Sequence, residues 1–213
     1  TGSPPPGADL AVALSFDDSW VSHLRVAAPA LLARGWDAGI FLATDAIGNP
    51  GMLSWAEVRE LEDLGFAIGS HGASHRFLNQ LPADELDGEL ERSRTALEDC
   101  LQKPVTMLSL HGGRCNRRVL EAAKAAGYSL VFGSRPGIWA GKEPTPAAGA
   151  QHEAIPRCVI RRGATGARTV LALLENPAGA VAHLARRDRL LGFLRRLFGD
   201  RLYHALHRFW VAE

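Results

Sequence analysis

The sequence has few cysteines, almost no net charge and no long apolar run, and each absence excludes a class of protein. Three cysteines in 213 residues (Cys100, Cys115 and Cys158) are too few for a disulfide-stabilised scaffold. A formal net charge of +1 gives no electrostatic reason to expect a nucleic acid as partner. No apolar run approaches the ~20 residues of a membrane-spanning helix, and no signal peptide is recognisable.

The composition is that of a globular protein, and the order of its apolar segments predicts an α/β fold. Hydrophobic residues make up 46% of the chain, enough for one domain with a sizeable core, or for such a domain with an appendage. Apolar runs predict strands over residues 11–16, 38–43, 66–69, 105–110, 128–132 and 155–160. Helical spacing predicts helices over residues 20–34, 54–64, 82–101 and 116–126, and again from residue 167. Because strands and helices alternate without hairpins, we expect a parallel sheet or barrel.

Two adjacent carboxylates, Asp17 and Asp18, follow the first predicted strand, which we expect to be buried. Open α/β sheets and barrels place their active sites at the C-terminal ends of strands. Neighbouring side chains on a strand point in opposite directions, so we expect one carboxylate to face a metal ion and the other a substrate or water. The alternative is that the pair caps the helix beginning at Trp20.

Two histidines four residues apart, His71 and His75, come directly after the third predicted strand. From a tight loop their imidazoles can converge on one ion, and neutral imidazole suits zinc and its first-row neighbours. The alternative is a pair of structural histidines, and Ser74 between them is expected to order the loop. Two histidines and a carboxylate at successive strand ends leave coordination positions open, which is typical of a catalytic metal site.

The two motifs together resemble a known family. Residues 15–19 (SFDDS) followed by residues 70–75 (SHGASH) are similar to the first two motifs of polysaccharide deacetylases of the NodB-homology type, carbohydrate esterase family 4. The resemblance extends from residue 8 to residue 160 and leaves the arginine-rich C-terminus outside. It implies a distorted, incomplete (β/α) barrel, which agrees with the alternation of strands and helices.

The resemblance also implies an activity and a role for each motif residue. Asp17 would be the general base, while Asp18, His71 and His75 would hold one divalent metal ion, expected to be zinc, with cobalt or nickel as alternatives. The implied reaction is hydrolysis of N-acetyl groups on an amino-sugar polysaccharide, with an N-acetylated glycan as partner and no nucleic acid. The implied location is the cell envelope, the periplasm or outside the cell.

The third motif of the family, Arg-x-Pro-Tyr-Gly, is altered in this chain. The matching residues 109–113 are SLHGG, so Ser109 replaces the arginine that braces the catalytic carboxylate. His111 replaces proline, and Gly112 replaces the aromatic residue whose N–H serves the oxyanion. Gly112 still offers an N–H, whereas His111 is either a substrate-side or metal-side group or a loop histidine in solvent. The family's last histidine, the acid for the leaving group, is not recognisable, and His111 is our first candidate for that role.

These departures leave two other functions open. The chain would otherwise deacylate a small amide or a lipid-linked sugar, or be a metal-binding or carbohydrate-binding domain with impaired catalysis. Several apolar residues would contact a sugar ring: Leu53, Trp55, Phe77, Ile138 and Trp139.

The C-terminus differs in composition from the rest of the chain. We expect residues 1–166 to form the deacetylase domain and residues 167–213 to form a basic helical extension. An apolar stripe beside arginines runs along the extension: Leu190, Leu194, Leu197, Phe198, Leu202, Leu206 and Phe209. We expect this stripe to pack on the barrel or on another subunit. The alternative is a basic amphipathic helix that contacts an anionic membrane surface.

Overall fold

The computed structural model describes residues 12–139, 154–160, 163–190 and 192–193. The chain divides into two compact units, one of residues 1–133 and 146–154, the other of residues 134–145 and 155–213. The domain boundary that we place at residue 166 stays a prediction.

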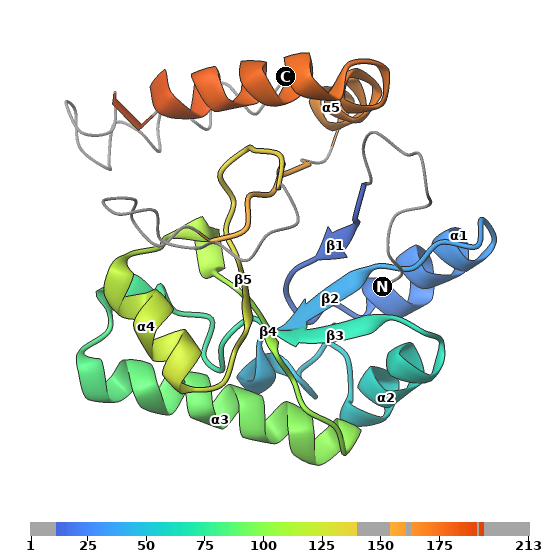
Figure 1. Cartoon of the computed structure of the whole chain (residues 1–213). Coiled ribbons are helices and arrows are strands. Elements are labelled where there is room, and N and C mark those ends of the chain that lie inside the picture. The colour runs from blue at the N-terminus through green and yellow to red at the C-terminus, as the bar shows by residue number, and fades with distance from the viewer. Residues whose placement is uncertain (1–11, 140–153, 161–162, 191, 194–213) are drawn as a thin grey trace. The chain divides into compact units, whose positions relative to one another are not determined.

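The first unit contains a five-stranded sheet in the order β1-β2-β3-β4-β5 (Figure 1). Its strands are β1 (Ser15–Phe16), β2 (Gly39–Leu42), β3 (Ala67–Ser70), β4 (Met107–Ser109) and β5 (Leu130–Phe132). Every neighbouring pair is parallel, so the C-terminal ends of all five strands lie at the same edge. The sheet curls into a half-barrel with helices on its outside, which confirms the predicted incomplete (β/α) barrel.

Helices connect the strands. They are α1 (Ala28–Leu32), α2 (Trp55–Asp63), α3 (Ala83–Leu101) and α4 (Arg117–Ala125). Of these, α2, α3 and α4 begin within one residue of the predicted starts. Helix α2 starts with a capping box, in which the Ser54 hydroxyl accepts from the Glu57 N–H and the Glu57 carboxylate accepts from the Ser54 N–H. The Asn116 side chain caps α4 by accepting from the Val119 N–H at 2.9 Å.

The predicted helix over residues 20–34 is interrupted. A π-helical turn, His23–Ala27, precedes α1. Pro29 stands in the first turn of α1 and has no N–H to donate to the carbonyl four residues earlier. A wider turn before it is consistent with this missing bond.

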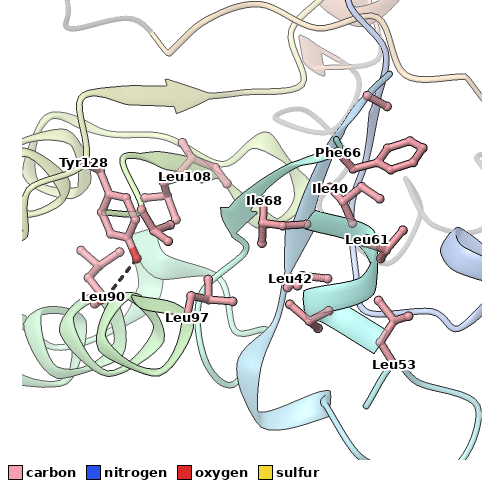
Figure 2. Close-up of a cluster of buried hydrophobic side chains, with 14 of the residues drawn as sticks. Ile40, Leu42, Leu53, Leu61, Phe66, Ile68, Leu90, Leu97, Leu108 and Tyr128 are labelled. Carbon is pink, nitrogen blue, oxygen red and sulfur yellow. Dashed lines mark hydrogen bonds between the residues drawn. The ribbon is translucent and has the colours of Figure 1, made fainter. Parts of the chain in front are cut away.

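The core of the first unit lies between the sheet and its helices (Figure 2). Helix α3 packs against β3, α2 and α4, and Leu90 and Leu97 of α3 face the sheet. The Tyr128 hydroxyl donates to the Leu90 carbonyl at 3.2 Å, so its polar group is satisfied inside the core. Each fully buried Leu or Ile contributes about 1.5–3 kcal/mol. Leu53, predicted as a sugar contact, is 0% exposed and belongs to this core, so that prediction is wrong.

Two predicted strands differ from the structure. The first strand was expected to be buried, but β1 lies at one end of the strand order and residues 12–15 are exposed. An end strand pairs on one side only, which leaves it more accessible. No strand forms between residues 154 and 160, where Ile155 makes one isolated bridge. Pro156 follows directly and lacks the N–H that a continuing strand would need.

Between residues 164 and 190 the second unit is largely helical, as the sequence predicts from residue 167 onward. Helix α5 (Ala164–Glu175) is followed by a helical stretch over residues 177–190. Within the described part of the chain, no helix combines the length and apolarity needed to cross a membrane. Residues 194–213, which carry most of the predicted apolar stripe, lie outside the described residues, so the packing of that stripe stays a prediction.

Candidate active site

The predicted site residues all follow strands of the first unit. Asp17 and Asp18 come after β1, His71 and His75 after β3, and His111 and Gly112 after β4. Three of them meet at one point, because Asp18 Oδ1 lies 2.8 Å from His75 Nε2 and 3.7 Å from His71 Nε2. In a tetrahedral zinc site with bonds of about 2.0–2.1 Å, ligand atoms lie about 3.3 Å from each other. The two observed distances lie on either side of that value.

The turn after β1 fixes Asp18. The buried Ser19 hydroxyl donates to the Ala43 carbonyl and accepts from the Ala43 N–H, which ties this turn to the end of β2. Asp18 has a φ of 70°, a left-handed conformation that is uncommon outside glycine and is often found at functional sites. The Trp20 indole N–H donates to Asp18 Oδ2 at 3.2 Å, while Oδ1 faces the histidines. Sequence reasoning missed this role of Trp20.

The capping alternative for the two carboxylates is not what the structure shows. The residue before the π-helical turn is Ser22, which has helical backbone angles and makes no side-chain capping bond. Asp18 contacts the two histidines instead, and Asp17 contacts Ser109. The two carboxylates therefore face different partners.

His71 is held in the orientation that a metal ligand needs. Its side chain is 2% exposed, and Nδ1 lies 2.8 Å from the Ser109 carbonyl oxygen. A carbonyl can only accept, so Nδ1 carries the hydrogen and Nε2 has a free lone pair toward Asp18. Burial lowers the pKa of His71, which keeps the ring neutral, as ligation requires.

A buried carboxylate on α3 fastens the histidine loop, which we define as residues 70–75. Glu89, 6% exposed, accepts from the Ala73 N–H at 2.9 Å, from the Ser74 N–H at 2.6 Å and from the Ser74 hydroxyl. Ser74 therefore orders the loop, as predicted. Sequence reasoning missed Glu89, although its place among the apolar positions of α3 was a signal.

A chain of hydrogen-bonded hydroxyl groups also stabilises the start of the histidine loop. The Ser70 hydroxyl accepts from the Gly72 N–H at 3.0 Å and pairs with the Ser93 hydroxyl at 2.9 Å. The Ser93 hydroxyl in turn pairs with the Tyr128 hydroxyl at 3.0 Å. This buried chain connects the loop to α3 and to the start of the segment leading into β5.

Asp17 lies half-buried beside β4. The Ser109 hydroxyl, completely buried, donates to Asp17 Oδ2 at 3.0 Å. Ser109 stands where the family pattern has arginine, so a neutral donor here contacts the carboxylate that the arginine would brace. The carbonyl of the same residue orients His71, so Ser109 contacts both carboxylate and histidine sides of the site.

His111 belongs to the glycine loop, residues 111–113, and is half-buried. Its ring centroid lies 3.8 Å from that of His75 and 5.7 Å from that of His71. Burial, together with the neighbouring His75 and His71, lowers the pKa of His111 to about 4. The ring therefore packs against the histidine loop and is not a loop histidine in open solvent, while a functional role for His111 stays a prediction.

Gly112 has a φ of 60° and is exposed. A Cβ atom built on it would come within 2.9 Å of the Phe77 ring, so a residue with a side chain does not fit without movement. Phe77 packs on His111 with a centroid distance of 4.6 Å. An aromatic ring thus flanks the glycine loop, but it comes from the segment after the histidine loop and not from position 112.

Comparison with known proteins identifies the family of this chain. Residues 6–131 match the family described as polysaccharide deacetylase. The chain belongs to this family. It is 29% identical over 126 residues, 59% of its length, to YxkH of Bacillus subtilis (strain 168), which carries the same family name.

Solved structures of deacetylases share the fold. The deacetylase PplD of Streptococcus pyogenes, in complex with acetate, superposes with a TM-score of 0.61 at 24% identity, covering 71% of this chain and 66% of that one. The polysaccharide deacetylase BC0361 of Bacillus cereus gives a TM-score of 0.64 at 23% identity, covering 76% and 50%. This chain spans 45% of the length of YxkH.

Proposed function

We propose that this chain is a metal-dependent deacetylase that hydrolyses N-acetyl groups of an amino-sugar polysaccharide. The observation that carries the proposal is the meeting of Asp18, His71 and His75 at one point beside Asp17. Membership of the polysaccharide deacetylase family supports the reaction, and the acetate complex of PplD supports an acetyl-sized product. The chain spans less than half the length of YxkH. The polysaccharide substrate is therefore proposed here and does not follow from that similarity.

The side chains present fit one divalent ion. Asp18 offers Oδ1, and His71 and His75 offer Nε2 atoms, a carboxylate and imidazole set that suits zinc and also cobalt or nickel. Both the Trp20 N–H on Asp18 and the Ser109 carbonyl on His71 are outer contacts of the kind that orient metal ligands. When bound, such an ion supplies Lewis-acid polarisation of the acetyl carbonyl and a more acidic water.

The remaining residues would move protons and bind the developing charge. Asp17, held by Ser109, takes the proton of the attacking water. The Gly112 N–H donates to the oxyanion. His111 passes the proton to the leaving amine, and because its pKa lies at about 4 it is neutral near pH 7 and acts as a relay rather than as a proton store.

Two substitutions test these roles together. We expect Asp17→Asn to keep the metal and to lose about 10²–10⁴-fold in turnover, the usual contribution of a general base. His75→Ala should lose the metal itself. Metal content and acetate release from an N-acetylated amino-sugar oligomer are measured on the same preparations, with the exposed His183→Ala as matched control. Full activity of metal-loaded Asp17→Asn would contradict the base assignment.

The serine at position 109 supports a second candidate function. In this alternative the chain is a metal-binding or carbohydrate-binding domain with impaired catalysis. The Ser109 hydroxyl is neutral, whereas the family's arginine brings a charge to the catalytic carboxylate. The discriminating observation is a metal-loaded protein that binds an acetylated glycan and releases no acetate. A third candidate is a deacylase of a small amide or a lipid-linked sugar. Acetate released from such a compound, but not from a polymer, would favour it.

The location implied by the family, in the envelope or outside the cell, stays part of the proposal.

A further inference from the structure

A further nitrogen donor, on His111, lies close to the nitrogens of two of the three proposed ligands, His71 and His75. The nitrogens of His71, His75 and His111 that face the site all lie within 4.8 Å of one another. The His75 and His111 rings meet edge to face, with centroids 3.8 Å apart and an angle of 60° between their planes. At this spacing small side-chain rotations bring the three nitrogens onto one ion.

We propose that His111 is a fourth ligand of the metal ion bound by Asp18, His71 and His75. The inference rests on the proposed function, which supplies the ion. In the family pattern this position is a proline, which has no donor atom to offer, so the fourth ligand is a property of this chain. It turns a site of one carboxylate and two imidazoles into one of one carboxylate and three imidazoles.

The surroundings of His111 hold its ring toward the histidine loop. Phe77 packs against one part of the ring, with planes tilted by 38°, and the Arg114 guanidinium lies 3.8 Å from the centre of the Phe77 ring. Gly112 leaves space for Phe77, since a Cβ there would collide with it. The ring of His111 therefore has two ring neighbours, Phe77 and His75.

A fourth ligand changes how the site is used. Three protein ligands leave a tetrahedral ion open to water or substrate, whereas four fill it. His111 then competes with the substrate for one position and must withdraw before turnover. Gly112 and Gly113, both at positive φ, give the loop the backbone freedom for that movement. The withdrawn imidazole is then available for the proton transfer of the proposed function.

The test compares His111→Phe with Phe77→Leu. The first variant keeps an aromatic ring against Phe77 and removes the nitrogen, and the second removes the packing ring and keeps the nitrogen. Zinc affinity is measured by competition with a chromophoric chelator, and the visible spectrum of the cobalt-loaded protein reports coordination number. We expect His111→Phe to bind zinc at least tenfold more weakly, a loss of the size that outer contacts alone already produce, and to shift the cobalt bands. Phe77→Leu should stay within about threefold and keep them.

X-ray absorption on the zinc-loaded natural sequence gives a measurement that needs no folded variant. Scattering from three imidazoles supports the proposal, and scattering from two overturns it. Unchanged affinity and spectrum in His111→Phe also overturn it, as does an equal loss in both variants, which would assign the effect to loop packing. In each of these cases a metal bound by the natural sequence leaves the proposed function standing. A natural sequence that binds no metal would end both proposals.

Discussion

The histidine loop and the glycine loop carry the three histidines of the site, but the protein holds them differently. The histidine loop continues the pairing of β2 and β3, with His71, Thr44 and Asp45 N–H groups donating across it. The Glu89 carboxylate accepts two further N–H groups of the loop, those of Ala73 and Ser74. The glycine loop is a single short helical turn, in which the Gly113 and Arg114 N–H groups donate to carbonyls of the same segment, and its ring contacts are with His75 and Phe77.

This difference matches the sequence motifs. The loop that is hydrogen-bonded to β2 and α3 is the one that keeps the family pattern, and the loop that is hydrogen-bonded within its own turn is the one that departs from it. We infer that the histidine loop sets the position of the metal, while the glycine loop adjusts what else reaches it.

The largest effect is expected from Glu89→Ala, which removes the hydrogen bonds between α3 and the histidine loop. It leaves the Ala73 and Ser74 N–H groups without their acceptor in a buried place. Each such group costs about 1–3 kcal/mol, so for the two groups we expect a loss of about 2–6 kcal/mol in unfolding free energy, together with weaker metal binding. Urea unfolding and zinc competition measure the two effects.

The exposed Glu91→Ala, two residues further along α3, is the matched control for Glu89→Ala. It should change neither quantity by more than about 0.5 kcal/mol. Equal stability of the two variants would mean that strand pairing alone holds the histidine loop, and the contrast between the loops would fail.

The elements that sequence predicts best here depend on short-range patterns. The capping box of α2 and the Asn116 cap of α4 involve residues three positions apart, which any reader of the sequence can see. The positions of Asp17 and of His71 at strand ends follow from the alternation of strands and helices. For these features, local physics and the final fold agree.

The features that sequence missed depend on contacts between distant segments. The position of Glu89 on the buried face of α3 could be read from the sequence, but its partners, the Ala73 and Ser74 N–H groups, come from a distant segment. The closeness of His111 to His75 depends on how β4 pairs with β3, and a glycine-rich loop has no periodicity from which to infer it. Trp20 reads as the start of a helix, yet its indole reaches back to Asp18.

A smaller effect is expected from Ser109→Ala. This residue contacts Asp17 and His71 through different atoms, and the substitution removes only one of them. The hydroxyl contacts Asp17, whereas the backbone carbonyl contacts His71 and survives the substitution. A hydrogen bond to a charged group is worth about 1.5–3 kcal/mol, so turnover should fall about 10- to 100-fold. Zinc affinity should not change. Acetate release and zinc competition are compared with Thr106→Ala, an exposed position just before β4. Loss of metal in Ser109→Ala would contradict this separation.

The smallest effect is expected at Trp20, which combines a fixed indole N–H with a ring that is 48% exposed. Trp20→Phe removes the bond to Asp18 and keeps a ring, whereas Trp20→Ala removes both. If the exposed ring stacks on a sugar, only the alanine variant raises KM for an acetylated oligomer, by about two- to tenfold, since such contacts are worth about 0.5–1.5 kcal/mol. Both variants should weaken zinc binding equally, because both lose the N–H. Trp36, 55% exposed and placed before β2 at the opposite end of the strands, gives the control Trp36→Ala. An equal rise in KM for the phenylalanine and alanine variants would show that Trp20 acts through Asp18 and not by stacking.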